Sequence, residues 1–199
     1  KIEYIDGSYF NNKIDNLRVV EKRSKRKNPL FSFATYLRAI IVEIVGKNRH
    51  QVTGSATLIS IPLKDGKYKK LLIELGGNQT NKDLYTEYLY NKEIVDAIPH
   101  NEIDYVFVLH SHYDHIGNLP SLTANGFNGK MICNEENEKL MLPILLDGAF
   151  IMNKNVRAIN SKKKNVEPLY TEVDVYLLMN KCETYSMNEI HKLDDIVSF

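Results

Sequence analysis

The stretch that decides the fold runs from Tyr105 to Pro120 and reads YVFVLHSHYDHIGNLP. Its first five residues are a continuous apolar run, four of them β-branched or aromatic, which predicts a short buried strand. Gly117, Asn118 and Pro120 at its other end are typical of a turn. Between strand and turn, three of the chain's six histidines stand with one aspartate. These side chains are therefore expected on a loop at the end of a core strand.

The three histidines and the aspartate of this loop belong to residue types that commonly bind metal ions. Neutral imidazole and carboxylate groups are preferred by zinc and related metals. Because side chains alternate along a strand, His110 and His112 are expected on one face, while Asp114 and His115 follow the turn and can reach a second position. The pattern predicts a metal site that serves two adjacent ions. The alternative, ordinary core or surface histidines, does not explain why strand, cluster and turn agree.

The HxHxDH motif after an apolar strand resembles the metallo-β-lactamase fold, whose members are mostly binuclear metallohydrolases. Flanking segments resemble its β-CASP branch, which holds RNA-processing and some DNA-processing nucleases. The resemblance covers roughly residues 35 to 199 and implies an α/β fold that is the N-terminal part of a four-layered αββα sandwich. The segments that carry it are Val52–Ser55, Leu71–Gly77, Ile103–Tyr105, Leu119–Leu122, Gly126–Phe127, Leu145–Asp147 and Glu167–Glu172.

The resemblance also implies roles for the motif residues. His110 and His112 would bind one ion, Asp114 and His115 would bind the other, and Asp114 is the candidate catalytic residue. Two zinc ions are expected in the complete enzyme, with manganese as the alternative because it also binds histidine–carboxylate sites. A hydroxide bridging the ions would attack an RNA or DNA phosphodiester in line, and the metals would stabilise the charge that develops on the phosphoryl oxygen.

Two features depart from the family pattern. The acid before the glycine pair is usually aspartate and here is Glu74, which we expect to support the metal ligands from behind; the alternative is a surface acid at a strand end. The family also has further ligands downstream, and Asp195–Phe199 resembles the strand that leads into the next motif, so we expect a fragment of a larger enzyme. His50, His100 and His191 do not fit the missing positions and are predicted to be ordinary exposed residues.

Composition restricts the partners. The net charge of +1 excludes a strong nucleic-acid-attracting field over the whole chain. The basic runs Lys22–Lys27 and Lys162–Lys164 are either phosphate contacts or solvated linkers. Cys133 and Cys182 lie far apart without CxxC spacing, which indicates no disulfide framework and a reducing, cytoplasmic compartment. No apolar stretch approaches the length of a membrane span, so we expect no membrane partner.

The chain is expected to divide at residue 33. Residues 1–33 form a basic, polar segment, and residues 34–199 form the metallo-β-lactamase-like domain. Within the first segment, Ile5–Arg18 resembles the middle of an HNH endonuclease motif, although Tyr4 stands where that family has a histidine. The segment is either an HNH-like remnant or an asparagine-rich turn before a helix.

Periodicity and turn residues place the other elements of the domain. Strands are predicted over 40–45, 56–62, 70–75 and 131–133, with a turn at 64–66. Helices are predicted over 83–98, over 137–152 with Pro143 kinking or opening it, and over 171–179 with Thr171 as its cap. Strands followed by alternating helices and strands indicate a layered α/β fold.

Three functions are compatible with these observations. The leading one is a β-CASP-like nuclease acting on RNA or DNA, represented by its N-terminal half. The second is a metallo-β-lactamase-fold hydrolase of a small ester, thioester or lactam, because a fold alone does not determine the substrate. The third is an inactive member that binds nucleic acid or a partner subunit. A homodimer is also compatible with the sequence.

Overall fold

The computed structural model describes residues 2–4, 17–19, 40–45, 54–79 and 83–199. The chain divides into two compact units, Lys1–Leu37 and Arg38–Phe199. In the first unit, β1 (Ile2–Tyr4) pairs with β2 (Leu17–Val19) in antiparallel fashion. Most of the HNH-like stretch, the basic run at 22–27 and His50 lie outside the described residues.

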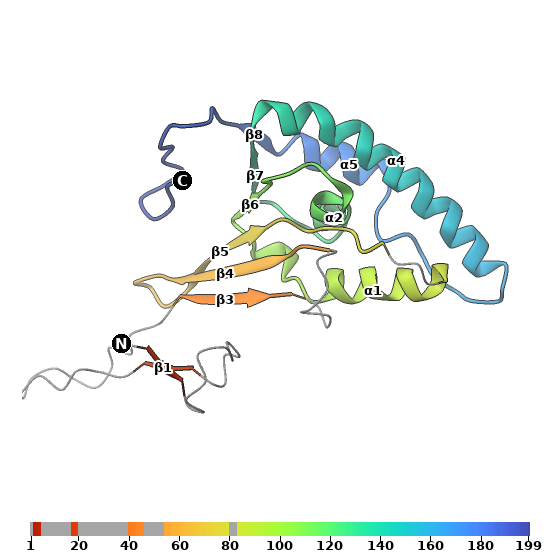
Figure 1. Cartoon of the computed structure of the whole chain (residues 1–199), viewed down its shortest axis with the longest axis horizontal. Helices are drawn as coiled ribbons and strands as arrows, with labels where there is room; N and C mark the ends of the chain where they lie inside the picture. The colour runs from red at the N-terminus through yellow and green to blue at the C-terminus, as the bar shows by residue number, and fades with distance from the viewer. Residues whose placement is uncertain (1, 5–16, 20–39, 46–53, 80–82) are drawn as a thin grey trace, which may run out of the picture. The chain divides into compact units, whose positions relative to one another are not determined.

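The second unit is built on a six-stranded mixed sheet with the order β3-β4-β5-β6-β7-β8 (Figure 1). The first three strands are antiparallel, and the last three run parallel to β5 and to one another. Parallel neighbours need crossover connections, which the helices provide. The α/β class predicted from the sequence is confirmed. The strands are β3 (Ile41–Ile44), β4 (Thr57–Pro62), β5 (Tyr68–Ile73), β6 (Tyr105–Phe107), β7 (Lys130–Cys133) and β8 (Cys182–Thr184).

The hairpin of β4 and β5 forms where the turn residues predicted it. Thr57 lies opposite Ile73 and Pro62 opposite Tyr68, and Gly66 adopts a φ of 95° between the strands. The strands predicted at 40–45 and 131–133 are also present. Strand β8 was not predicted, because its three residues are too few to show an alternating pattern.

The helices follow their caps. α1 (Leu84–Asp96) begins after Asp83, whose side chain accepts hydrogen bonds from two backbone N–H groups of the first turn. α5 (Glu172–Met179) begins after Thr171, as predicted, with a reciprocal capping box to Asp174. The short elements are η2 (His100–Glu102), α2 (Tyr113–Ile116) and α3 (Pro120–Ala124).

Helix α4 (Glu135–Asn160) is longer than the predicted helix over 137–152. It contains 26 residues and runs through Pro143. Its N-terminus is capped by the Asn134 side chain, which accepts a hydrogen bond of 2.8 Å from the backbone N–H of Asn137. Glutamates in the first turn favour the positive end of the helix dipole. These terminal interactions and a buried face are sufficient for the helix to continue past the missing N–H of the proline.

The two faces of the sheet are covered differently. Figure 1 shows the helices gathered on one side, over a core that includes Leu72, Val106 and Met131. On the opposite face, Leu71, Phe107 and Ile132 pack with Val197 of the C-terminal segment. Within the described part of the chain, no helix is both long and apolar enough to cross a membrane.

The C-terminal segment is not the strand that was predicted at 195–199. It contains an isolated bridge between Lys192 and Ser198, and Asp194 holds it in place. The carboxylate of Asp194 accepts a hydrogen bond of 2.5 Å from Lys69 Nζ and one of 3.0 Å from the Tyr105 hydroxyl. It also accepts two from backbone N–H groups of its own turn. The segment turns back on itself, since His191 and Phe199 exchange backbone hydrogen bonds, and the Asp194 side chain stabilises this turn.

Candidate functional site

The motif loop begins after Phe107, where strand β6 ends. His110 and His112 therefore lie in a loop and not on the strand, which corrects the predicted strand alternation. The two imidazoles nevertheless lie together, with ring centroids 4.0 Å apart, and the His110 and His115 centroids are 5.1 Å apart. His110 and His112 are exposed. Three imidazoles thus gather at the carboxyl ends of the parallel strands, where α/β sheets commonly bind ligands.

Asp114 and His115 lie on α2 and form a second pair. The distance from Asp114 Oδ2 to His115 Nε2 is 3.7 Å, and both side chains are about one third exposed. The structure therefore places the four predicted ligands close to one another at the strand ends. It arranges them as an imidazole pair beside an imidazole–carboxylate pair.

Glu74 lies behind this second pair. Its side chain is 6% exposed, and its Oε2 atom is 2.7 Å from His115 Nδ1. The contact is close, but its angle is not that of a regular hydrogen bond. Glu74 is thus a buried residue, which excludes the surface-acid alternative. Its position leaves the Nε2 atom of His115 directed toward Asp114.

The backbone of Glu74 is strained. Its φ is 61°, in the left-handed region that residues other than glycine, asparagine and aspartate rarely adopt. A residue held there costs on the order of 1 kcal/mol and persists only where its surroundings force it. Strand β6 helps to hold Glu74 in this conformation, because the Glu74 N–H donates a hydrogen bond to the carbonyl of Phe107. Strain beside a cluster of polar groups is typical of functional sites.

A ladder of backbone hydrogen bonds holds the motif loop against residues 74–77. The N–H groups of Leu75 and Gly77 donate to the backbone carbonyls of His115 and Tyr113, respectively. Ser55, outside this range, donates to the carbonyl of Asp114; all three bonds measure 2.8 to 3.1 Å. A Cβ atom on Gly76 would lie 1.7 Å from the carbonyl oxygen of Asp114. Close approach of the two backbones therefore requires glycine at this position.

The ring of Tyr113, in the middle of the motif, fills a slot formed by three glycines. An added Cβ atom would lie 2.1 Å from the Tyr113 ring at Gly77 and 2.7 Å from it at Gly117. At Gly148, in α4, it would lie 3.2 Å from the same ring. Burial raises the pKa of the Tyr113 hydroxyl, although the contact with the Tyr170 hydroxyl acts in the opposite direction. Tyr170 in turn donates a hydrogen bond of 2.7 Å to the carbonyl of Gly117. The motif is thereby fastened to the helical layer.

Three buried asparagines join α1 to the same loop. Asn91 Oδ1 accepts from the Asn78 N–H at 2.7 Å and from Asn118 Nδ2 at 2.8 Å. Asn118 Nδ2 also donates to the carbonyl of Gly76. Sequence reasoning missed this network, because the asparagines are far apart in the chain and belong to no motif. The glycine slot was equally hidden, although a glycine inside a helix, as at Gly148, is a signal of close packing.

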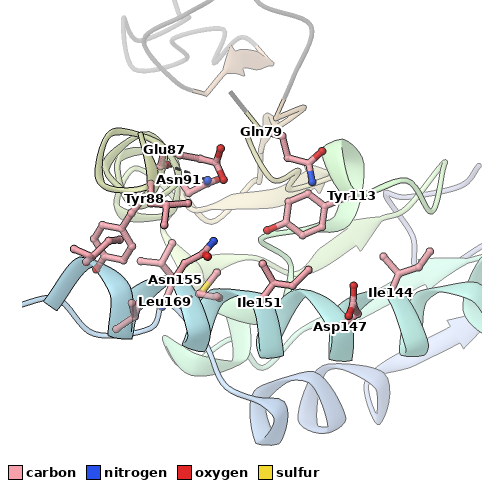
Figure 2. A pocket seen from close by; sticks show the side chains of 14 residues that line it. Gln79, Glu87, Tyr88, Asn91, Tyr113, Ile144, Asp147, Ile151, Asn155 and Leu169 are labelled. Carbon is pink, nitrogen blue, oxygen red and sulfur yellow. Dashed lines mark hydrogen bonds between the residues drawn. The ribbon is translucent and has the colours of Figure 1, made fainter. Parts of the chain in front are cut away.

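A cavity of about 200 Å³ lies between α1 and α4, beside Tyr113. Figure 2 shows Glu87 and Asn91 from α1 and Asn155 from α4 directed into the space that Tyr113 borders. A second cavity, of about 260 Å³, lies at the carboxyl ends of β6 and β7 and includes Leu109, the residue before His110. Cavities therefore border the motif loop on its helical side and at the strand ends.

The other described histidines have local structural roles. His100 Nε2 lies 2.9 Å from the carbonyl oxygen of Val95 at the end of α1, and burial lowers the pKa of its imidazole. His191 Nε2 lies 2.8 Å from the carbonyl oxygen of Ser186. Both are half-buried, so the prediction that they are exposed was wrong. Each imidazole packs into a local turn that sequence spacing does not show.

The donor chemistry of the motif fits a metal ion, but only in part. Among the residues that the structure describes, no group of three or more His, Cys, Asp and Glu side chains is placed to hold one. Catalytic zinc sites usually have three protein ligands. His110 with His112, and Asp114 with His115, therefore fit as two partial sites, each of which needs a further donor.

The fold and these residues define an α/β protein with a histidine–aspartate loop at its strand ends. No known protein-family model matches the chain. It is 35% identical over 97 residues to transcription termination factor FttA from Methanosarcina mazei, which covers 49% of this chain and 14% of that protein. It is 32% identical over 96 residues to cleavage and polyadenylation specificity factor 73 from Drosophila melanogaster, covering 48% and 13%. The matched part thus spans about one seventh of these curated relatives.

Proposed function

We propose that this chain is part of a metal-dependent nuclease of the metallo-β-lactamase fold, β-CASP branch, that cleaves RNA or DNA phosphodiesters. The observation that carries the proposal is the pairing of His110 with His112 and of Asp114 with His115, with buried Glu74 behind the second pair. The partial similarity to proteins named for transcription termination and for cleavage and polyadenylation supports a nucleic-acid substrate.

The residues of the site have separate tasks in this proposal. His110 and His112 hold the first ion, and Asp114 and His115 hold the second. The ions, zinc or alternatively manganese, supply an activated water and stabilise charge on the phosphoryl oxygen. Glu74 lies against the Nδ1 side of the His115 ring, which leaves Nε2, on the side of Asp114, as the ligand atom. The exposure of His110 and His112 leaves room for a phosphodiester strand to approach.

The domain organisation belongs to the same proposal. Residues 34–199 are the N-terminal half of an αββα sandwich, and residues 1–33 are a separate basic segment with an HNH-like remnant. Support comes from the two faces of the sheet, since the face opposite the helices is also apolar at Leu71, Phe107 and Ile132. A sandwich requires two apolar faces on each of its sheets. A reducing, cytoplasmic compartment is also proposed, because the chain has only two cysteines, far apart in the sequence and without CxxC spacing.

A second candidate is a non-catalytic member that binds nucleic acid or a protein partner. One observation favours it: the described residues bring no three metal donors to a common point. In that case the motif loop would keep its packing but would no longer bind metal or catalyse hydrolysis. Hydrolysis of a small ester, thioester or lactam is the remaining enzymatic alternative.

A substrate panel with metal analysis separates these candidates. The complete gene product is incubated with end-labelled single-stranded RNA, the matching DNA and a thioester, and bound zinc and manganese are measured per chain. The proposal predicts bound metal and cleavage of a nucleic acid, with both lost in His112→Ala and kept in the exposed control Lys64→Ala, in the turn between β4 and β5. Binding of RNA without metal or cleavage would support the non-catalytic candidate. Turnover of the thioester alone would contradict a nuclease.

A further inference from the structure

The two cysteines, 49 residues apart in the chain, lie side by side in the sheet. Cys133 is the last residue of β7 and Cys182 is the first of β8, and the two strands are parallel neighbours. Met131 is opposite Cys182, and Cys133 is opposite Thr184, so the two thiols share one face of the sheet. Their Sγ atoms are 3.2 Å apart, and both are free. This is the distance of a thiol–thiol hydrogen bond.

The surroundings make the two thiols unequal. Cys133 directly precedes Asn134, the cap of the 26-residue helix α4, whose dipole favours negative charge at this end. The hydrogen bond from Cys182 lowers the pKa of the Cys133 thiol, and burial acts against it. The same hydrogen bond, together with burial, raises the pKa of the Cys182 thiol. Cys133 is therefore the more readily ionised of the two thiols.

A cavity borders one of the two cysteines, Cys133. Cys133 is 6% exposed, but it lines the cavity of about 260 Å³ at the carboxyl ends of β6 and β7. Asn134, Tyr185 and Met187 are among the other lining residues. A thiol that is buried from bulk solvent but borders a cavity can react with a small oxidant, while a bulky reagent is excluded.

We propose that Cys133 and Cys182 form a redox modification site in which a small peroxide converts the two thiols into an intramolecular disulfide. The inference is independent of the proposed nuclease function, because it uses neither the motif residues nor a metal ion. It rests on the distance between the Sγ atoms, their common face of the sheet and the cavity beside Cys133.

The reaction has two steps. In the first, the Cys133 thiolate attacks one oxygen of hydrogen peroxide, the O–O bond breaks, and hydroxide leaves with a proton as water, so that a sulfenic acid forms. In the second, the Cys182 sulfur displaces the hydroxyl group from Cys133, and the thiol proton leaves with it as a second water. Two thiols are oxidised by two electrons, and one peroxide is reduced to two waters. Closure needs the sulfurs to approach by about 1 Å, to the disulfide length. Because the two cysteines are offset by two residues in the strand register, closure also needs a backbone shift of the edge strand β8.

The bond would tie the edge strand β8 to a strand beside the motif loop. The Tyr185 N–H already donates to the carbonyl of Cys133, and the Val108 N–H donates to that of Ile132. Reduction would release the edge strand again. The pair therefore supplies a reversible covalent link at the strand ends.

Peroxide titration of the reduced chain tests the proposal. The chain is treated with stoichiometric hydrogen peroxide, remaining thiols are blocked by alkylation, and peptides are analysed by mass spectrometry without reduction. We expect a Cys133–Cys182 cross-linked peptide in most chains and its return to two thiols with dithiothreitol. In Cys182→Ser, dimedone should trap a sulfenic acid at Cys133. In Cys133→Ser, the remaining thiol should react more slowly than Cys133 does in Cys182→Ser, because Cys182 is not among the residues that line the cavity and does not adjoin the cap of α4.

Two controls keep the test decisive. Circular dichroism shows that each serine variant is folded, and the urea-unfolded chain shows the cross-linking rate without the native geometry. Oxidation of both cysteines to sulfinic acid without a cross-link would overturn the proposal. It would also be overturned if intermolecular dimers dominated, if peroxide left both thiols intact, or if unfolding did not slow the intramolecular cross-link.

Discussion

The two sides of the motif loop differ in how firmly the fold holds them. On the inner side, the Tyr113 ring fills a glycine slot, and Ile116 and Asn118 are fully buried. On the outer side, His110 and His112 are exposed. The inner side contributes packing and backbone hydrogen bonds, and the outer side contributes groups with metal-binding chemistry. A rigid inner side can therefore fix the positions of exposed ligands without contacting them.

The largest effect is expected from a methyl group on the inner side. Gly76→Ala places a Cβ atom 1.7 Å from the Asp114 carbonyl oxygen, which is backbone and cannot rotate away. We expect a loss of about 3 kcal/mol or more in the free energy of unfolding, measured by urea denaturation. Gly126→Ala is the matched control. Gly126 has a positive φ but no heavy atom within 4 Å of an added Cβ, so its loss should be about 1 kcal/mol. Equal losses of unfolding free energy in Gly76→Ala and Gly126→Ala would contradict the tight packing of the inner side.

The next effect is expected from the asparagine network. Asn91→Ala removes an acceptor that serves the Asn78 N–H and Asn118 Nδ2. The Asn78 N–H and one N–H of the Asn118 amide would lose their acceptor in the protein interior, so we expect a loss of about 2 kcal/mol in the free energy of unfolding. The exposed Asn101→Ala should change it by less than about 0.5 kcal/mol. A loss in Asn91→Ala no greater than this control would mean that water replaces the missing amide.

A smaller effect is expected far from the motif, at the C-terminal turn. Lys69 holds the pKa of Asp194 below its usual range, so ionised Asp194 stabilises the folded state at neutral pH. The contribution is present above the unfolded-state pKa of about 3.9 and is lost as the pH falls through the lower folded-state value. Asp194→Asn should cost about 1 kcal/mol at pH 7, because the pair is partly exposed.

Urea denaturation of both proteins at pH 7 and pH 3 measures this difference. The gap between the unfolding free energies of wild type and Asp194→Asn should narrow at pH 3, because Asp194 of the unfolded wild-type chain takes up a proton below its pKa of about 3.9 while the folded chain keeps the carboxylate ionised. A gap that is constant or widens as the pH falls would contradict the assigned ion pair.

Local patterns in the sequence predicted the outer side of the loop better than the inner side. The HxHxDH cluster, the hairpin turn and the Thr171 cap are each determined by a few adjacent residues, and all were located correctly. The Tyr113 slot, the Asn78–Asn91–Asn118 network and the Cys133–Cys182 contact join residues from separate elements. Tertiary packing creates them, and no local pattern encodes that packing. The predicted helix over 137–152 stops short of Asn160, because the polar residues at 153–155 separate it from Val156 and Ile159, which only the folded structure shows to be buried.

The central claim is that the outer histidines serve ligand binding and not stability, and one measurement tests it most directly. Urea denaturation of the wild type and His112→Ala is compared with and without zinc. Without zinc, the two free energies of unfolding should agree within about 0.5 kcal/mol, because His112 is exposed. With zinc, the wild type should gain stability and His112→Ala should gain much less, because a ligand stabilises only the state that binds it. A large loss in His112→Ala without zinc, or equal gains with zinc, would contradict the claim.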